Sequence, residues 1–98
     1  MLFDVVTTEA FTDWLDGVSD EVAKAAIAMR IVRVGSGLLG NVRSVGEGVS
    51  ELKVDVGQGY RVYFTIRHLE LVVLLCGGTK KSQGKDIRRA KKLAAQLE

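Results

Sequence analysis

The 98-residue chain predicts an α+β fold: an N-terminal strand and a helical hairpin packed on a mainly antiparallel four- to five-stranded sheet, followed by a C-terminal helix. Three observations predict this order. Residues 9–34 carry apolar side chains at helical spacing, residues 41–77 read as strands joined by glycine-rich turns, and residues 82–97 return to helical spacing. The length predicts a single domain, 1–98, because domains typically have roughly 100–150 residues.

The N-terminal third predicts one strand and two helices. Residues 2–7 have the β-branched and aromatic content of a short strand, and Thr8 is predicted to cap a helix that ends at Gly17. Ser19 is predicted to cap a second helix. Since few residues join them, the helices are expected to lie side by side as a hairpin. The apolar stripe expected on the second helix comprises Val22, Ala25, Ala26, Met29 and Val32, widened by Ile27, Ile31 and Val34.

A glycine-rich loop follows the second helix. Its spacing, Gly35-x-Gly37-x-x-Gly40, matches the skeleton of a dinucleotide-binding fingerprint. That fingerprint follows a strand and opens a helix, whereas this loop follows a helix and leads to a short strand candidate, residues 41–45. We therefore assign the loop to a connection.

Residues 46–64 predict the β-hairpin around which the chain is organised, since polar and apolar side chains alternate there. A three-residue loop, Gly57 to Gly59, keeps apolar residues opposite one another, whereas a two-residue loop would put one strand's core set in water. The apolar face comprises Leu52, Val54, Val56, Tyr60, Val62 and Phe64. The polar face comprises Glu51, Lys53, Asp55, Arg61, Tyr63 and Thr65. The predicted cross-strand pairs are Val56 with Tyr60, Val54 with Val62, Leu52 with Phe64, Asp55 with Arg61 and Lys53 with Tyr63.

The remaining chain predicts a buried strand and an amphipathic helix. Residues 70–77 are almost continuously apolar, which is typical of a central strand covered on both faces. The last helix is expected to begin near Ser82, and all the helices are expected to pack on one face of the sheet. Its inner residues are expected to be Ile87, Ala90, Leu93, Ala94 and Leu97.

Composition excludes several classes of protein. With Cys76 as the single cysteine, neither an intrachain disulfide nor a cysteine cluster for zinc can form. The first eight residues lack the features of a signal peptide, and the longest apolar run is too short to cross a bilayer, so we expect a cytoplasmic protein. Residues 80–98 carry a local net charge of +5 and residues 1–79 carry −3. This asymmetry indicates a polyanionic or acidic protein partner, although a solvated lysine-rich helix face has the same pattern.

Several motifs occur in one order along the chain: Gly46-Glu-Gly-Val-Ser-Glu-Leu-Lys53, Gly57-Gln-Gly-Tyr-Arg-Val-Tyr-Phe64 and Leu74-Leu-Cys-Gly-Gly78, followed by Lys80, Gln83, Asp86-Ile87 and Ala90. With them the chain resembles the RelE/ParE toxin superfamily, and more closely its HigB-like, phage-derived addiction module killer protein branch. The resemblance implies a RelE-like fold and the toxin of a type II toxin–antitoxin system.

The resemblance leaves the target open. Many relatives cut mRNA within the ribosome without a metal, whereas the ParE-like branch inhibits DNA gyrase without catalysis. We expect a metal-independent, ribosome-dependent mRNA endonuclease with no cofactor and no membrane contact. Its expected partners are mRNA on the ribosome and a cognate antitoxin, for which a helix-turn-helix protein is one expectation. The alternatives are a gyrase inhibitor and a degenerate, non-toxic relative that binds only the antitoxin.

Metal-free RNA cleavage needs a base for the 2′-hydroxyl, cations for the charge on the phosphate and an acid for the leaving 5′-oxygen. By resemblance and by face, Arg61 is the first choice to hold the scissile phosphate, because its planar fork suits phosphate oxygens. Lys53 would add charge or act as the base, and Lys80 would reach the same surface. Tyr63 would stack on a base or donate a proton. The residues expected to contact RNA around this centre are Arg43, Lys81, Lys85 and Arg88.

Other readings of these residues remain open. Arg61 and Lys53 also fit a cross-strand charge ladder with Asp55 and Glu51. His68 is expected to be a surface residue in a turn, and Cys76, Trp14 and Phe11 are expected to be core residues. Residues 82–98 contain no aromatic residue and no histidine, although some mRNA-cleaving relatives carry one near the C-terminus.

Overall fold

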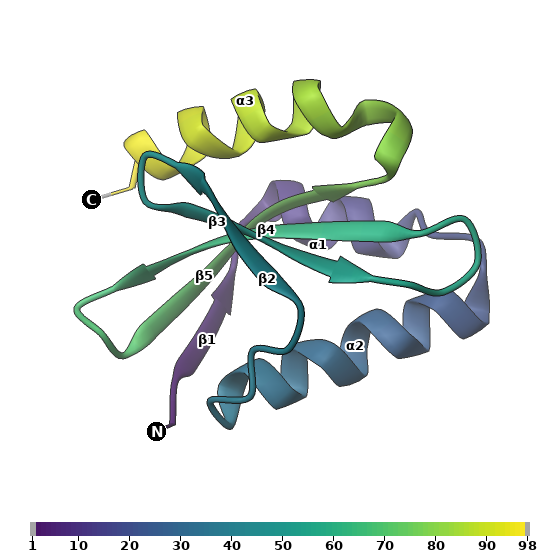
Figure 1. The fold of residues 1–98 in the computed structure, drawn as a ribbon, viewed down its shortest axis with the longest axis horizontal. Helices are drawn as coiled ribbons and strands as arrows, with labels where there is room; N and C mark the ends of the chain where they lie inside the picture. Colours follow the sequence, from purple (N-terminus) through teal and green to yellow (C-terminus); the bar gives the residue numbers. More distant parts are fainter. Residues whose placement is uncertain (1, 98) are drawn as a thin grey trace.

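The computed structural model describes residues 2–97, which form a five-stranded sheet with helices on both of its faces (Figure 1). The strand order is β1-β5-β4-β3-β2; β1 pairs with β5 in parallel, and the other pairs are antiparallel. The predicted α+β fold with a mainly antiparallel sheet and a C-terminal helix is therefore confirmed. The elements are β1 (Asp4–Thr7), α1 (Glu9–Asp16), α2 (Glu21–Gly35), β2 (Val42–Gly46), β3 (Val49–Val54), β4 (Tyr60–Arg67), β5 (Leu71–Gly78), the 3-10 helix η1 (Lys80–Ser82) and α3 (Gln83–Ala95).

Side-chain caps fix where the first two helices begin. Thr8 caps α1 as predicted: its hydroxyl accepts a hydrogen bond from the Phe11 amide at 3.1 Å and donates one to the Leu75 carbonyl on β5 at 2.6 Å. The cap of α2 is Asp20, not the predicted Ser19, and its carboxylate accepts hydrogen bonds from two amides of the first turn. A carboxylate is favoured there because it also meets the positive end of the helix dipole.

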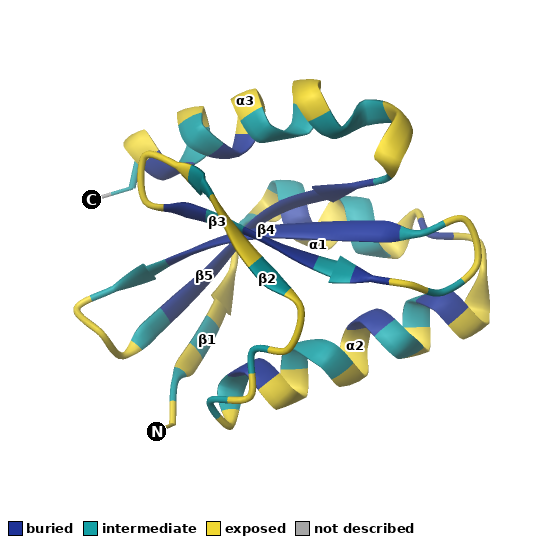
Figure 2. Cartoon of the chain, in the orientation of Figure 1, coloured by how far each residue is buried: buried dark blue, intermediate teal, exposed yellow. Residues whose placement is uncertain are grey.

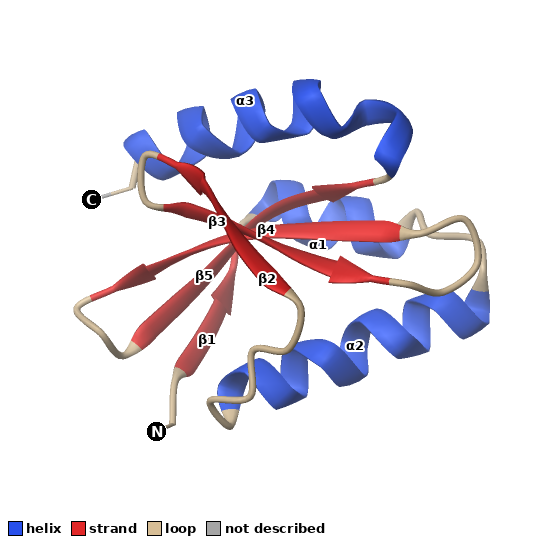
Figure 3. Ribbon diagram, in the orientation of Figure 1, coloured by secondary structure: helices blue, strands red, loops and turns tan. Residues whose placement is uncertain are grey.

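We predicted that all the helices would pack on one face of the sheet, and this prediction is wrong. α1 packs on β5 and α2 packs on β1 and β3 on one side, whereas α3 covers the opposite side (Figure 3). The reason is that the strands are apolar on both sides. Leu52 and Phe64 point into the core beneath α1 and α2, while Val49 and Leu75 point the other way and need the apolar stripe of α3 to cover them. α1 and α2 lie on the same side of the sheet as the predicted helical hairpin, and residues of both helices, such as Phe11 and Ile27, belong to one core cluster.

The buried stripe of α2 also differs from the prediction. Ala23, Ile27 and Val34 are buried against the sheet. Val22, Met29 and Val32 are 71%, 55% and 64% exposed (Figure 2). The helix is apolar almost all round, so spacing alone fits two stripes, and packing against β1 and β3 selects the one that carries Ile27.

The register of the β3–β4 hairpin is shifted by two residues from the predicted one. Lys53 pairs with Arg61 and Glu51 pairs with Tyr63, and a five-residue connection, residues 55–59, replaces the predicted three-residue loop. Two glycines with positive φ, Gly57 and Gly59, allow the wider loop, and Val56 folds back to pack on the core. A shift of two leaves every side chain on its predicted face. Asp55 is therefore not opposite Arg61.

The glycine pair at the end of β5 belongs to the strand, which extends one residue beyond the predicted range of 70–77. Gly77 pairs with Val62 and Gly78 pairs with Arg61. A Cβ on Gly77 would overlap the Trp14 indole ring of α1, and one on Gly78 would overlap the Asp86 carboxylate of α3. The absence of two side chains thus lets α1 and α3 approach opposite faces of the same strand end. Within residues 2–97, none of the helices combines the length and the apolar character that crossing a membrane requires.

Candidate functional site

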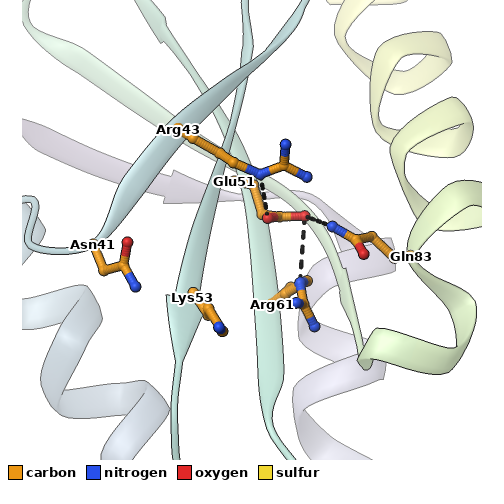
Figure 4. Close-up of a pocket in the computed structure, with 6 residues that line it drawn as sticks. All are labelled: Asn41, Arg43, Glu51, Lys53, Arg61 and Gln83. Carbon is orange, nitrogen blue, oxygen red and sulfur yellow. Dashed lines mark hydrogen bonds and ion pairs between the residues drawn. The ribbon is translucent and has the colours of Figure 1, made fainter.

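A polar pocket of about 290 Å³ opens on the sheet face that α3 covers, beside the first residue of that helix (Figure 4). Three strands and the N-terminus of α3 supply its walls, so residues distant in sequence converge at one place. The residues that line the pocket are Asn41, Arg43, Glu51, Lys53, Arg61 and Gln83.

Glu51 lies at the centre of this pocket and is 3% exposed. One carboxylate oxygen accepts a hydrogen bond from Arg43 Nε at 3.0 Å. The other accepts hydrogen bonds from Gln83 Nε2 at 2.9 Å and from the Tyr63 hydroxyl at 3.0 Å. A buried carboxylate is costly unless it is paired and hydrogen-bonded, and these donors from β2, β4 and α3 meet that requirement.

The environment of Glu51 decides its charge. Burial alone would raise the pKa of this carboxyl, but the hydrogen bonds from Arg43, Gln83 and Tyr63 outweigh burial, and the pKa lies below 4.5. Burial, then the hydrogen bond to Glu51, raise the pKa of Tyr63 well above its usual range. Glu51 is therefore a fixed anion, and Tyr63 is a weak acid held beneath it.

Arg61 forms the floor of the pocket and is 7% exposed. Its Nε lies 3.5 Å from the second oxygen of Glu51, which is an ion-pair distance, and the same nitrogen is buried without a hydrogen bond. On one side the strand neighbour is Lys53, and on the other it is Gly78, whose missing side chain leaves room for the Asp86 carboxylate of α3. The carboxylate thus holds Arg61 by charge while leaving it hydrogen-bonding capacity.

A third arginine, outside the lining, fixes the edge of the pocket. Arg30 of α2 donates to the Lys53 carbonyl at 2.8 Å and to the Leu39 carbonyl at 3.2 Å, while the Lys53 amide donates to the Asn41 carbonyl at 3.0 Å. Gly40, with φ of +70°, makes room for this guanidinium: a Cβ there would lie 2.7 Å from Arg30 Nη2. The loop after α2, predicted only as a connection, is one, and it also positions Asn41 beside Lys53.

The structure brings together three of the predicted site residues and separates the others. Arg61, Lys53 and Arg43 line the pocket. Tyr63 is fully buried below it, so its ring has no free face on which a base could stack. Lys80 is exposed on η1 but does not line the pocket. The other cations predicted to contact RNA also lie exposed on η1 and α3, away from the pocket lining: Lys81, Lys85 and Arg88.

The polar face of the hairpin also contains the predicted ion pairs in a different arrangement. Lys53 Nζ lies 3.6 Å from Asp55, and Arg61 is paired with Glu51 rather than with Asp55. The central role of Glu51, with Gln83 and Asn41 as its neighbours in the pocket, was not predicted. Alternation already placed Glu51 beside Lys53 and Arg61; what was missing was the position of α3 over that face.

Two other reactive side chains lie outside the site. Cys76 is buried, as predicted, and burial raises the pKa of its thiol to about 11, so it is not a nucleophile near neutral pH. His68 is exposed in the β4–β5 turn, as predicted. Within residues 2–97, His, Cys, Asp and Glu side chains form no group of three or more that could hold a metal ion.

The pocket can bind an anion. Three cations and one carboxylate line it, which leaves a formal charge of +2 on an open, polar surface. Arg43 and Arg61 present guanidinium groups suited to phosphate oxygens, and Asn41 and Gln83 add neutral amides. The arrangement therefore fits a phosphodiester better than an apolar ligand.

The model of the family described as "Phage derived protein Gp49-like (DUF891)" matches residues 13–97. The chain belongs to this Gp49-like family. An uncharacterized protein of Haemophilus influenzae is 46% identical over 97 residues, which cover 99% of this chain and 98% of that protein.

The Gp49-like chain also has the fold of a solved toxin. It superposes on the E. coli toxin RelE, determined in the free state as a double arginine-to-alanine mutant, with a TM-score of 0.69 over 99% of this chain and 100% of that one. The sequence identity is 16%, so this likeness concerns the fold. The predicted RelE-like fold is therefore confirmed, and the family match agrees with the predicted phage-derived branch.

Proposed function

We propose that this Gp49-like protein is the toxin of a type II toxin–antitoxin system and acts as a metal-independent, ribosome-dependent mRNA endonuclease in the cytoplasm. The observation that carries the proposal is the pocket in which Arg43, Lys53 and Arg61 surround the buried Glu51. The fold shared with RelE supports the same function. A cognate antitoxin would neutralise the protein, and a helix-turn-helix protein remains one expectation for it.

The reaction places distinct demands on the pocket. The 2′-oxygen of the RNA attacks phosphorus and forms a 2′,3′-cyclic phosphate while the bond to the 5′-oxygen breaks. The proton of the 2′-hydroxyl passes to a base, and the 5′-oxygen takes up a proton. Negative charge grows on the phosphoryl oxygens as the new bond forms, so fixed cations stabilise the transition state.

Arg61 is proposed to hold the scissile phosphate from one side, and Arg43 would contact the same phosphate from the other side. Glu51 contacts both guanidinium groups and keeps them in place before RNA arrives, so it acts as a positioning residue. The phosphate must compete with this carboxylate for Arg61.

Lys53 is the lining group best suited to exchange a proton with RNA, because arginines stay protonated and both oxygens of Glu51 are occupied. Lys80, Lys81, Lys85 and Arg88 would contact the RNA backbone further along.

One observation favours a second candidate function. Tyr63 is buried and its pKa is raised, and residues 82–98 carry neither a histidine nor an aromatic residue. The pocket therefore offers fewer acid groups than cleavage would use. A non-catalytic inhibitor of DNA gyrase would need none. A degenerate relative that only binds an antitoxin is the third alternative.

Expression in bacteria tests the proposal. We expect induction of the wild-type chain to arrest growth and co-expression of its cognate antitoxin to restore it. Primer extension should show cuts in translated regions, and these cuts should disappear with Arg61→Ala. Asp16→Ala is the matched control, because Asp16 is exposed on α1, across the sheet from the pocket, and does not line it.

The outcomes separate the candidates. Intact transcripts during growth arrest would contradict the endonuclease. Inhibition of purified gyrase in a supercoiling assay at micromolar protein would then support the second candidate. Normal growth on expression without the antitoxin would support the degenerate relative.

A further inference from the structure

The outer side of α2 carries an apolar seam that no part of residues 2–97 covers. Val22, Met29 and Val32 are exposed by more than half, and Ala25 is exposed between them. Figure 2 shows exposed segments along α2. We call these four residues the α2 seam. Their spacing of three, four and three residues is the pattern of a coiled-coil interface, which places one line of side chains along a helix. Three of the large apolar side chains that the described chain exposes thus lie on one line.

We propose that the α2 seam is a homodimer interface, in which α2 of a second copy of this chain packs antiparallel against it. Read in opposite directions, the two seams match in a single register. Val22 lies level with Val32 of the second copy, and Ala25 lies level with Met29. Each large thioether therefore faces a small alanine, which is the alternation of large and small residues that helix packing favours. The pairing is isologous about a two-fold axis, as in most homodimers.

Charge along the helix favours the antiparallel direction over the parallel one. The N-terminal end of α2 is acidic, with Asp20 and Glu21, and the exposed Arg33 lies in its last turn, whereas Arg30 donates to the Lys53 and Leu39 carbonyls. An antiparallel pair brings the acidic end of each helix to the basic end of the other and opposes the two helix dipoles. A parallel pair would set like charges together and place Met29 against Met29.

The size of the seam sets the expected strength. α2 has 15 residues, and specific stable interfaces bury about 1,200 Å² or more in total. Two helices of this length reach only the lower end of that range, even with the exposed Leu38 close to the helix end. We therefore expect a weak, concentration-dependent dimer, whose assembly leaves the polar pocket on the opposite face of the sheet open.

Sedimentation velocity of the purified chain tests the dimer. We expect monomer at about 10 µM and a majority of dimer at about 500 µM. Met29→Lys should keep the chain monomeric over this range, because it places two charges in the interface. Leu69→Lys is the matched control: Leu69 is 77% exposed but lies in the β4–β5 turn, so this variant should dimerise like the wild type. A wild-type chain that stays monomeric, or two variants that behave alike, would overturn the proposal.

Cysteine cross-linking tests the direction. An equimolar mixture of Ala25→Cys and Met29→Cys should form a disulfide-linked dimer under mild oxidation, while each variant alone should cross-link several-fold less. The native Cys76 is buried, so the unmodified chain serves as the blank. Efficient cross-linking of each variant with itself would indicate parallel packing and contradict the proposal. Thermal unfolding by circular dichroism would show that both exposed-site variants are folded.

Discussion

The two faces of the sheet are built from the same strands but differ in how they are covered. On β3 and β4, Leu52 and Val62 face α1 and α2, whereas Glu51 and Arg61 face the side of α3. The first face is sealed by two helices. On the second face α3 begins only at Gln83, so the helix buries Tyr63 but leaves Lys53 at the rim of an open pocket.

This difference shows how a small domain can hold charges at low exposure and keep them accessible. The N-terminal end of α3 lies beside the charged Glu51 and supplies the side-chain amide of Gln83 as a hydrogen-bond donor, instead of covering Glu51 with apolar side chains. The carboxylate of Glu51 meets Gln83 from α3 on one side and solvent-facing cations on the other. The free energy of unfolding should therefore depend strongly on the first face, and function should depend on the second.

The largest effect on stability is expected from the sealed face. Leu52 is 1% exposed, and Leu52→Ala should lower the free energy of unfolding by about 3 kcal/mol through lost burial and the cavity left behind. Lys53→Ala, one residue along the same strand, should change it by less than about 0.5 kcal/mol. Urea unfolding followed by circular dichroism measures both. A small loss in Leu52→Ala would mean that this face is not the main core.

A smaller but still marked effect is expected at Glu51. Glu51→Ala removes the acceptor of Arg43, Gln83 and Tyr63 and leaves buried donors without a partner, at a cost of about 2 kcal/mol. Asp55→Ala breaks only an exposed ion pair and should cost less than about 0.5 kcal/mol. Equal effects in the two variants would show that Glu51 does not organise the pocket.

The pH dependence isolates the charge of Glu51. Because its pKa in the folded chain is lowered below 4.5, its carboxylate stabilises the fold above that pH, and this contribution is lost as the pH falls through the folded-state value. Wild-type stability should therefore decrease more steeply below about pH 4.5 than that of Glu51→Gln. Urea unfolding from about pH 3 to pH 7 gives the comparison. Parallel curves for the two proteins would contradict the assignment.

The sequence predicted the elements, the sheet and the side on which each hairpin residue lies, because alternation along a strand is a local property. Lys53 and Arg61 were predicted to share the polar face on this basis, and both line the pocket. The register of the hairpin was wrong because Gly57 and Gly59 permit loops of more than one length, and both registers preserve the faces. The observed register sets Tyr63 opposite Glu51, to which its hydroxyl donates, and places Val56 against the core.

The role of Glu51 could not be predicted for a related reason. It depends on Gln83, 32 residues away, and therefore on the face to which α3 returns. The buried stripe of α2 was likewise ambiguous, because a helix that is apolar all round has no unique inner side in sequence alone. In both cases the deciding contact joins elements that are distant along the chain.

The most direct test of the proposed function is cleavage of an mRNA bound to purified ribosomes by the wild-type protein, Arg61→Lys and Arg61→Ala. We predict that the wild type cleaves the mRNA without any metal ion beyond those that the ribosome buffer already contains. The rate should fall by about 10²- to 10³-fold in Arg61→Ala and partly in Arg61→Lys, which keeps the charge but loses the planar fork. An mRNA left intact by wild-type protein that arrests growth would contradict the assignment of the pocket as a nuclease centre.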